Sequence, residues 1–365
     1  MQQQQQLLQL QQRLLFFVLV GCCSCSCCND IAASALRAAV APAMSSASTC
    51  ALSPAAHPVR VFIEDTDCFG VVYYANYLRY FERAAASMVG TEAAGAQLEE
   101  GLAFGLTSAH GLKIAAPARL GDACVVRSTA LGIDGASQLA VRATLVREHD
   151  GLQLCSCDDL RLGFVRLATG AAGTSAASEE LLRNAAREWG GETESWAADS
   201  SPAAGPSDAA EPPARGGSPS LSAALLADEA PPLRLQFDEA GVGGGLTLHA
   251  ACRYFERHRT ECIGGPSALA ELQRSGVNVV VVRTNGLRLL PAAAGLRVGA
   301  PLDARCRVGV RGRRSTQVSF EQWLVCEASG QAVARADVTC VCLDAATGRI
   351  APAPADLVAR LAQLA

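Results

Sequence analysis

The sequence predicts an α+β protein made of two tandem units, each a long helix wrapped by an antiparallel β-sheet. The first supporting observation is a repeat, because Tyr80-Phe81-Glu82-Arg83 recurs as Tyr254-Phe255-Glu256-Arg257, a shift of 254 − 80 = 174 residues. The second is a series of apolar, β-branched runs after each copy, with the lengths and alternation of antiparallel strands. The third is a stretch rich in Ala, Ser, Gly and Pro between the copies, which is typical of a flexible linker.

The first unit is predicted to span residues 59–170. It begins with an apolar strand at 59–63, which runs into acidic residues and a glycine before the chain enters a helix at Asn76 and Tyr77. Three strands are expected after the helix, at 123–131, 138–146 and 152–167.

The second unit is predicted to span residues 231–355, after a linker at 171–230 in which 178–189 has the cap and early acids of a short helix. The helix stripe of the first unit recurs here, since Leu78 and Phe81 align with Cys252 and Phe255 at the same i, i+3 spacing. Four strands are expected at 277–282, 302–310, 317–325 and 331–343.

The composition limits the classes of partner. A length of 365 residues is typical of about two domains, and 50% hydrophobic residues suffice for sizeable cores. The formal net charge of -4 argues against a general nucleic-acid binder, so we expect no nucleic-acid partner.

The 16 cysteines are expected to be mostly buried free thiols in a reducing compartment. The pairs Cys155/Cys157 and Cys340/Cys342 lie in apolar runs, where alternate residues of a strand point to one face. No paired C-x-x-C set of zinc ligands is present, so we expect no metal and no other cofactor.

Residues 1–58 are predicted to be a targeting or disordered segment outside the fold. The apolar run 14–20 is too short to span a bilayer as a helix, and the Ala/Ser/Pro-rich stretch that follows it, 31–58, contains no Asp or Glu. A plastid transit peptide is favoured, alone or behind a signal segment; a mitochondrial presequence, a cytoplasmic protein, a membrane anchor and translation from Met44 are the alternatives. We expect no membrane association of the mature chain.

The run from Glu64 to Arg83 contains D-x-D, then Gly-Val-Val, an aromatic pair and N-Y-x-x-Y-F-E-R. This order of residues resembles the signature of the 4-hydroxybenzoyl-CoA thioesterase family of hotdog-fold proteins. The resemblance covers most of residues 57–170 and, more weakly, 231–355, where the late segments Ala334-Arg335-Ala336 and Thr347-Gly348-Arg349 look like the family's final strands. It implies that each unit is a hotdog and that the two units pair within the chain.

The resemblance also implies a site in the first unit. Asp67 would be the catalytic acid, as a nucleophile on the thioester carbonyl or as a base for water. The oxyanion would be met by a backbone N–H near Tyr74 at the helix start, where the helix dipole favours negative charge. The residues expected to shape the turn and contact substrate are Gly70, Val71, Tyr73 and Asn76, the last also as a helix cap.

Other polar residues of the repeat are expected to be structural. Asp65 would bond local backbone, and Glu82 with Arg83 would form an ion pair, because both recur in the second unit.

The second unit is expected to have lost the acid, because Asp67 aligns with Gly241. A small register shift would bring Glu239 nearer, and His249, aligned with Ala75, is expected to be a partly exposed histidine at the helix entrance. One active site per chain follows, with the second unit supplying pocket wall and coenzyme contacts. Four arginines are candidates for contacts with coenzyme phosphates, or solvated surface charges: Arg283, Arg288, Arg313 and Arg314.

The predicted function is that of an acyl-CoA or acyl-carrier-protein thioesterase, releasing a carboxylic acid and a thiol. Fatty acyl groups and an aromatic group such as 1,4-dihydroxy-2-naphthoyl both stay open as substrates, and so does a homo-oligomer of double-hotdog chains. One alternative is a hotdog dehydratase, which uses a His with an acid, whereas His110 and His149 lie far along the chain from Asp67. Another is a non-catalytic protein that binds acyl thioesters.

Overall fold

The computed structural model describes the chain in the stretches 56–67, 70–134, 137–169, 173–189, 211–213, 233–241, 244–311 and 316–364. The predicted targeting segment and most of the predicted linker therefore lie outside the described residues, as do Arg313 and Arg314.

The first half of the fold contains the expected long helix and later strands, together with elements that were not expected. The strand expected at 59–63 instead lies at 56–60, because the chain turns into a short 3₁₀ helix at Ile63. In chain order they are β1 (Ala56–Arg60), η1 (Ile63–Asp65), α3 (Asn76–Val89), α4 (Thr91–Glu99), β2 (Leu102–His110), β3 (Leu112–Ile114), β4 (Ala123–Asp134), β5 (Gln138–Arg147), β6 (Gln153–Arg166) and α5 (Ala176–Trp189). Helix α5 lies within the segment expected to be linker, yet it buries Leu182 and Ala185 against the core of this half.

The second half repeats the same plan. Its elements are η2 (Phe237–Glu239), α7 (Leu248–Ile263), α8 (Gly265–Arg274), β7 (Val277–Leu289), η3 (Pro291–Gly295), β8 (Leu302–Arg311), β9 (Gln317–Cys326), β10 (Ala332–Asp344), β11 (Ile350–Ala351) and α9 (Ala355–Ala362). The four predicted strands of this half are confirmed as β7, β8, β9 and β10.

The two halves share one antiparallel sheet, in the order β1-β4-β5-β6-β2-β7-β10-β9-β8. They meet where β2 pairs with β7, with Ser108 opposite Arg288 and Ala109 opposite Leu287. Strand β3 adds a second connection, because it pairs with both β6 and β7. The prediction that two hotdog units pair within one chain is confirmed, and the pair forms a continuous sheet.

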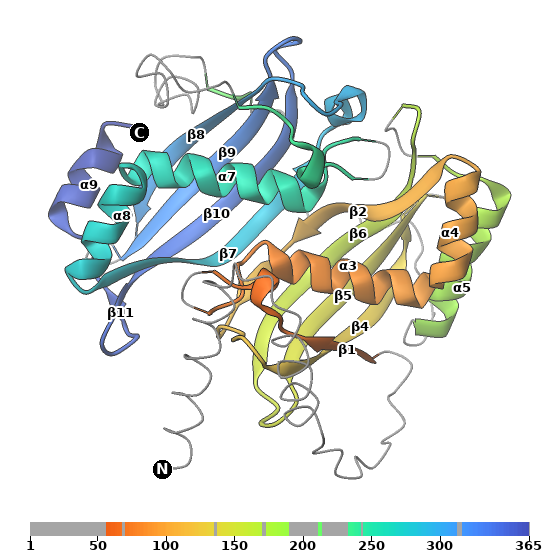
Figure 1. Cartoon of the computed structure of the whole chain (residues 1–365), viewed down its shortest axis with the longest axis horizontal. Helices are drawn as coiled ribbons and strands as arrows, with labels where there is room; N and C mark the ends of the chain where they lie inside the picture. Colours follow the sequence, from red (N-terminus) through yellow and green to blue (C-terminus); the bar gives the residue numbers. More distant parts are fainter. Residues whose placement is uncertain are drawn as a thin grey trace, which may run out of the picture. The chain divides into compact units, whose positions relative to one another are not determined.

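Helices α3 and α7 lie on the same face of this sheet, one in each half (Figure 1). Phe81 and Phe255, the repeated aromatic residues, are each 1% exposed and point into a single apolar core that runs through both halves. Helix α7 begins at a Thr247 cap, whose hydroxyl accepts the Ala250 N–H, and ends at Gly264 with a φ of 116°. The amphipathic repeat therefore positions two equivalent helix N-termini near the junction of the halves.

The cysteines of the described residues are free and buried, including Cys155, Cys157, Cys340 and Cys342. Their expected placement on one face of a strand is confirmed. Among the described residues, no helix is both long and apolar enough to cross a membrane.

Candidate active site

The turn that leads into α3 places the Asp67 carboxylate at the surface. Asp67 N–H donates to Val71 O at 2.8 Å, and Gly70 N–H donates back to Asp67 O at 3.0 Å. Gly70 has a φ of 68°, a conformation that glycine adopts without steric cost. One carboxylate oxygen of Asp67, Oδ1, also accepts the Val71 N–H at 3.2 Å. The side chain is thereby oriented while it stays exposed to solvent and substrate.

Asp65 supports this turn from behind. Its Oδ2 accepts the Phe62 N–H at 3.0 Å, and its backbone O accepts the Tyr73 N–H at 3.0 Å. The expected structural role of Asp65 is confirmed. Asn76, however, does not cap α3, because the cap position is Ala75 and the Asn76 Nδ2 donates to Asp65 O at 2.9 Å. That expectation was wrong because the amide is engaged by the preceding turn.

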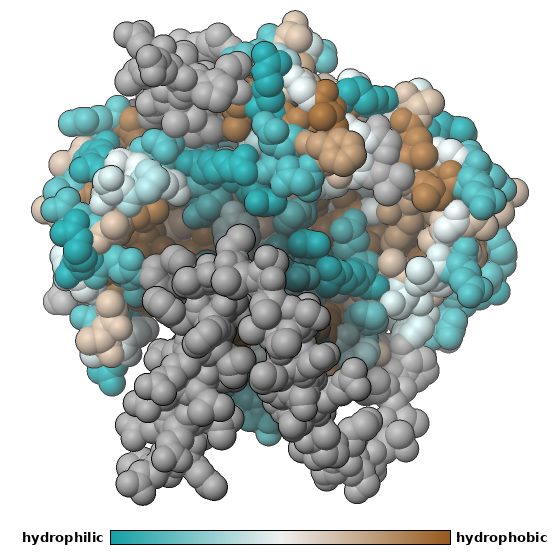
Figure 2. Space-filling model, in the orientation of Figure 1, coloured by the Kyte–Doolittle hydropathy of each residue, from teal (hydrophilic) through white to brown (hydrophobic). Residues whose placement is uncertain are grey.

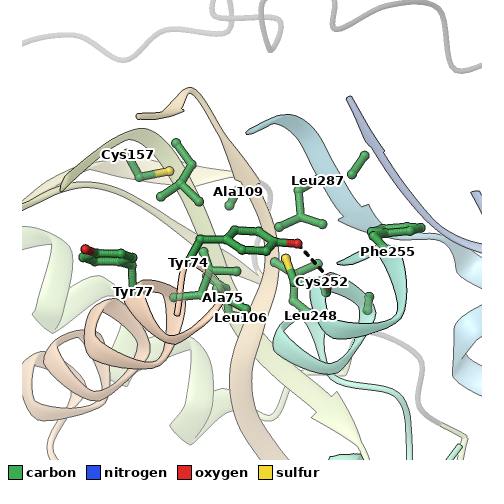
Figure 3. Packing of buried hydrophobic residues seen from close by; sticks show 14 of the residues in the cluster. Tyr74, Ala75, Tyr77, Leu106, Ala109, Cys157, Leu248, Cys252, Phe255 and Leu287 are labelled. Atoms are coloured by element: carbon green, nitrogen blue, oxygen red, sulfur yellow. Dashed lines mark hydrogen bonds between the residues drawn. The ribbon is translucent and has the colours of Figure 1, made fainter. Parts of the chain in front are cut away.

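Tyr74 offers its backbone N–H, while its hydroxyl is engaged elsewhere. Tyr73 N–H and Asn76 N–H have backbone acceptors, whereas within the described residues Tyr74 N–H has none. The Tyr74 hydroxyl donates to Cys252 O at 2.8 Å (Figure 3) and accepts from Arg259 Nη2 at 2.9 Å. Burial raises the pKa of this phenol well above its usual value, so it is not an acid of the site.

An apolar cavity of about 450 Å³ lies between the two halves. The first half contributes Val71, Tyr77 and Ile114 to its wall, and the second half contributes Leu269 and the β7 residues 279–282. A cavity of this size and character is typical of a small-ligand site.

A second cavity, of about 480 Å³, is lined mainly by polar residues. Its charged side chains are of both signs, namely Arg79 of α3 and Arg253 and Arg257 of α7 beside the carboxylates of Glu64, Asp67, Glu256 and Glu261. His249 of α7 also lines it. The exposed surface of α7 is correspondingly hydrophilic (Figure 2).

The two cavities share four residues, which are Asp67, Tyr73, Glu256 and Thr260. Of the residues predicted for the site, Val71 and Tyr74 also line the apolar cavity and Asn76 lines the polar one. Gly70 lines neither and serves the turn alone. The structure therefore brings Asp67 to the junction between an apolar cavity and a polar one.

The equivalent turn of the second half keeps the backbone and lacks the carboxylate. Gly241 N–H donates to Gly245 O and Gly244 N–H donates to Gly241 O, both at 2.9 Å, which repeats the bonds of Asp67. Glu239 matches Asp65, since each ends a short 3₁₀ helix before this turn. The register shift considered for Glu239 is therefore absent.

Glu239 is committed to the fold. It is 2% exposed, accepts from the Tyr254 hydroxyl, and pairs with Arg257 Nη2 at 2.6 Å. These contacts occupy both carboxylate oxygens.

His249 lies against the first half. Its Nε2 is 3.2 Å from Asn76 Oδ1, and it lines the polar cavity together with Asp67. Burial, followed by the nearby charges of Arg79 and Arg253, lowers the pKa of His249 to about 4. The imidazole is therefore neutral near pH 7.

The repeated glutamates have different partners. Glu82 accepts the Leu106 N–H at 2.9 Å rather than pairing with Arg83, so the expected ion pair is wrong for this half. Burial raises the pKa of Glu82. Its counterpart Glu256 instead forms an ion pair with the buried Arg259.

Two of the four arginines expected to contact coenzyme phosphates, Arg283 and Arg288, line neither cavity. Arg283 and Arg288 are on β7, where they face Lys113 and Ser108 across the junction of the halves. Neither lines the polar cavity, whose arginines come from α3 and α7.

One group in the described residues has the ligand types and spacing of a metal site. His258, Cys262 and Cys306 are all buried, with ligand atoms within 4.8 Å of one another. The hydrogen bond from the neighbouring thiol, together with burial, raises the pKa of Cys262, which favours the protonated thiol over the thiolate that binds metals. The group lies in the core of the second half and does not line either cavity.

Comparison with known proteins identifies the family. No family model matches the chain. It is 36% identical over 106 residues to the Acyl-CoA thioester hydrolase YbgC of Escherichia coli, a match covering 27% of this chain and 78% of that protein. The chain belongs to the hotdog-fold thioesterases of the 4-hydroxybenzoyl-CoA thioesterase type. It is a thioester hydrolase.

Two further relatives agree with this assignment. The thioesterase is 34% identical over 110 residues to the Acyl-CoA thioesterase YbgC of Haemophilus influenzae, covering 28% of this chain and 79% of that protein. The structure of the 12:0-ACP thioesterase from Umbellularia californica covers 78% of this chain and 92% of its own, with a TM-score of 0.52 at 12% identity. The last likeness shows that the fold extends over both halves.

The sequence-based prediction missed Arg259 and Thr260 at this site. Arg259 aligns with Ala85 at the shift of 174 residues, so a charge occupies a buried position of a repeated helix. A charged residue in the apolar stripe of the second copy was the available signal.

Proposed function

We propose that the thioesterase hydrolyses acyl-CoA esters at one site per chain, with Asp67 as the catalytic carboxylate. The observation that carries this proposal is the position of Asp67 at the junction of the apolar and polar cavities, beside the start of α3. The second half has glycine in the equivalent turn, and its Glu256, which also lines both cavities, is ion-paired with Arg259.

The apolar cavity would hold the acyl group, and the thioester carbonyl would lie at the start of α3. There the Tyr74 N–H and the helix dipole stabilise the oxyanion that forms as the carbonyl carbon is attacked. Asp67 either attacks this carbon directly or takes a proton from the attacking water, and the thiolate leaves. Both routes use the same carboxylate position.

The polar cavity would hold the thiol half of the substrate. Arg79, Arg253 and Arg257 line it, and guanidinium groups bind phosphate oxygens through charge-assisted hydrogen bonds. This supports coenzyme A, which carries phosphates at the end away from the thioester. An apolar chamber of about 450 Å³ admits either a fatty acyl or an aromatic acyl group.

The test is thiol release from a panel of acyl-CoA esters by the full chain, measured beside Asp67→Asn. We expect kcat/KM to fall by roughly 10²–10⁴-fold in Asp67→Asn, the range typical of removing a general base. Asp238→Asn is the matched control, because this exposed acid precedes the equivalent turn of the second half.

Equal turnover by wild type and Asp67→Asn would remove Asp67 from the reaction. Formation of enoyl-CoA from a 3-hydroxyacyl-CoA, with no thiol release, would support the dehydratase instead. Tight acyl-CoA binding without turnover would support the binding protein.

We also propose a plastid location, which rests on the acid-poor Ala/Ser-rich segment before residue 59. A fluorescent fusion carrying residues 1–58 should enter plastids, and uniform cytoplasmic fluorescence would contradict this. Homo-oligomerisation of the double hotdog stays a prediction, for which the molar mass in solution is the measurement.

A further inference from the structure

We propose that Arg259, on helix α7 of the second half, is a positioning residue for the active site of the first half. Arg259 holds the Tyr74 hydroxyl and thereby keeps the Tyr74 N–H directed at the thioester oxygen. The inference rests on the proposed function, because it assigns Arg259 to the oxyanion site described there.

Arg259 is buried and fully engaged at the interface of the halves. Its side chain is 2% exposed, and its Nη2 donates to the Tyr74 hydroxyl at 2.9 Å. Nη1 donates to Gln322 Oε1 at 2.6 Å, and Glu256 completes an ion pair. The guanidinium carbon also lies 5.2 Å from the centre of the Tyr74 ring. A buried guanidinium with this many partners has one defined position.

Two groups of α7 bracket the Tyr74 hydroxyl. Cys252 O accepts its hydrogen at 2.8 Å, and Arg259 donates to it from the position seven residues later on the same helix (Figure 3 shows the first contact). Residues seven apart lie on one face of a helix. The tip of the tyrosine is therefore fixed to the second half, while its backbone N–H stands at the start of α3 in the first half.

A tyrosine side chain has two rotatable bonds before its rigid ring, so fixing the hydroxyl restricts the backbone that carries it. The backbone in question is the turn Tyr74-Ala75 immediately before Asn76, where α3 begins. Arg259 also forms part of the wall of the apolar cavity. Because methionine is a long apolar side chain that can fill this part of the wall, loss of the bond in Arg259→Met should chiefly loosen the direction of the Tyr74 N–H. The expected kinetic signature is a fall in kcat with little change in KM.

The hydrogen-bonded pair of Tyr74 and Arg259 occurs on one side of the pseudo-symmetric molecule. At the shift of 174 residues, Tyr74 matches Leu248 and Arg259 matches Ala85, and both of these counterparts are buried. The equivalent positions on the side of Gly241 are therefore filled by apolar residues. Because apolar residues serve the fold at these positions, and because burying a charge has a desolvation cost, stability alone does not account for Arg259. The hydrogen-bonded pair of Tyr74 and Arg259 therefore lies on the side of the molecule that carries the Asp67 carboxylate.

The test compares Arg259→Met, Arg259→Lys and Tyr74→Phe with the double variant Tyr74→Phe/Arg259→Met, in the full chain. We expect Arg259→Met to lower kcat by roughly 10–100-fold and to change KM by less than about threefold. This fall in kcat is smaller than the fall expected when an oxyanion donor itself is removed. Arg259→Lys should recover part of this loss, because it restores one donor to the hydroxyl. The kcat of the double variant should be at most about twofold lower than that of Tyr74→Phe, since Arg259 acts through the Tyr74 hydroxyl.

Arg335→Met is the matched control, because Arg335 is a second buried, ion-paired arginine of the same half and does not line either cavity. It should lower the free energy of unfolding and leave kcat unchanged. Should Arg259→Met fail to fold, Arg259→Lys and Tyr74→Phe give the same comparison.

Unchanged kcat in folded Arg259→Met, or additive losses in the double variant, would overturn the positioning role. Failure of the proposed function looks different, because wild-type thiol release would then be absent or independent of Asp67.

Discussion

Acidification should destabilise the thioesterase through His249, whose imidazole lies between the two halves. Asn76 Nδ2 donates to Asp65 O, so its Oδ1 is the atom that faces His249 Nε2 at 3.2 Å. The neutral imidazole must therefore carry its proton on Nε2. Burial and the neighbouring Arg79 and Arg253 lower the pKa of the ring from 6.5 to about 4 in the folded chain.

The sign and size of the effect follow from these two pKa values. As the pH falls below about 6.5, the unfolded chain binds a proton that the folded chain does not bind, so the free energy of unfolding decreases. The decrease continues to about pH 4 and then stops. A difference of about 2.5 between the pKa values corresponds to at most about 3.4 kcal/mol. Solvent around the half-buried ring reduces this to roughly 2 kcal/mol.

The assay is urea unfolding of the wild type and His249→Asn at several pH values between about 7 and 4. Asparagine keeps an N–H for Asn76 and has no proton to gain. The other titrating groups, such as His57 and Glu82, are common to both proteins and cancel in the difference. The stability advantage of the wild type should shrink by roughly 2 kcal/mol as the pH is lowered. Parallel curves would refute the reasoning.

Two further substitutions test the turns. Gly111→Ala should lower the free energy of unfolding by roughly 1–3 kcal/mol, because Gly111 has a φ of 70° and an added Cβ would clash with the Asp158 carboxylate. Gly151 has a φ of 69° and open space around it, so Gly151→Ala should lower the free energy of unfolding by less. Equal decreases for the two variants in chemical denaturation would contradict this. The double variant Asp67→Asn/Gly241→Asp should release thiol no faster than Asp67→Asn, because a carboxylate alone does not make an active site. Faster thiol release by the double variant would contradict this.

The fold was predictable from periodicity because each strand and each long helix has its own local pattern. The runs at 123–131, 138–146 and 152–167 became β4, β5 and β6, and each strand extends no more than three residues beyond its run. The pairing of the halves was implied by the family resemblance, and two copies of one unit offer matching sheet edges for it. Strand β2 was missed because its Ala, Gly and Ser residues have weak strand propensity.

The turn that carries Asp67 was also predictable, since Asp67, Gly70 and Val71 form hydrogen bonds with one another within a few residues. The interactions that sequence did not reveal connect residues far apart in the chain. Tyr74 and Arg259 are 185 residues apart, and His249 and Asn76 are 173 apart. No local pattern encodes which side chains meet across a sheet junction. The same limit explains the errors at Asn76 and Glu82, whose partners lie on other elements.

Fusion of the two units explains how a polar pair could arise on one side only. In a homodimer every substitution occurs in both subunits. An arginine at a buried helix position of one subunit would therefore also be present at the same position of the other subunit. In the fused chain the two positions are independent, and they hold Arg259 and Ala85. The desolvation cost of a buried guanidinium is then incurred once, where Tyr74, Gln322 and Glu256 satisfy it. The opposite position, Ala85, is buried without a charge, so the side that has Gly241 in place of an acid incurs no such cost, while residues of both halves line the cavities at Asp67.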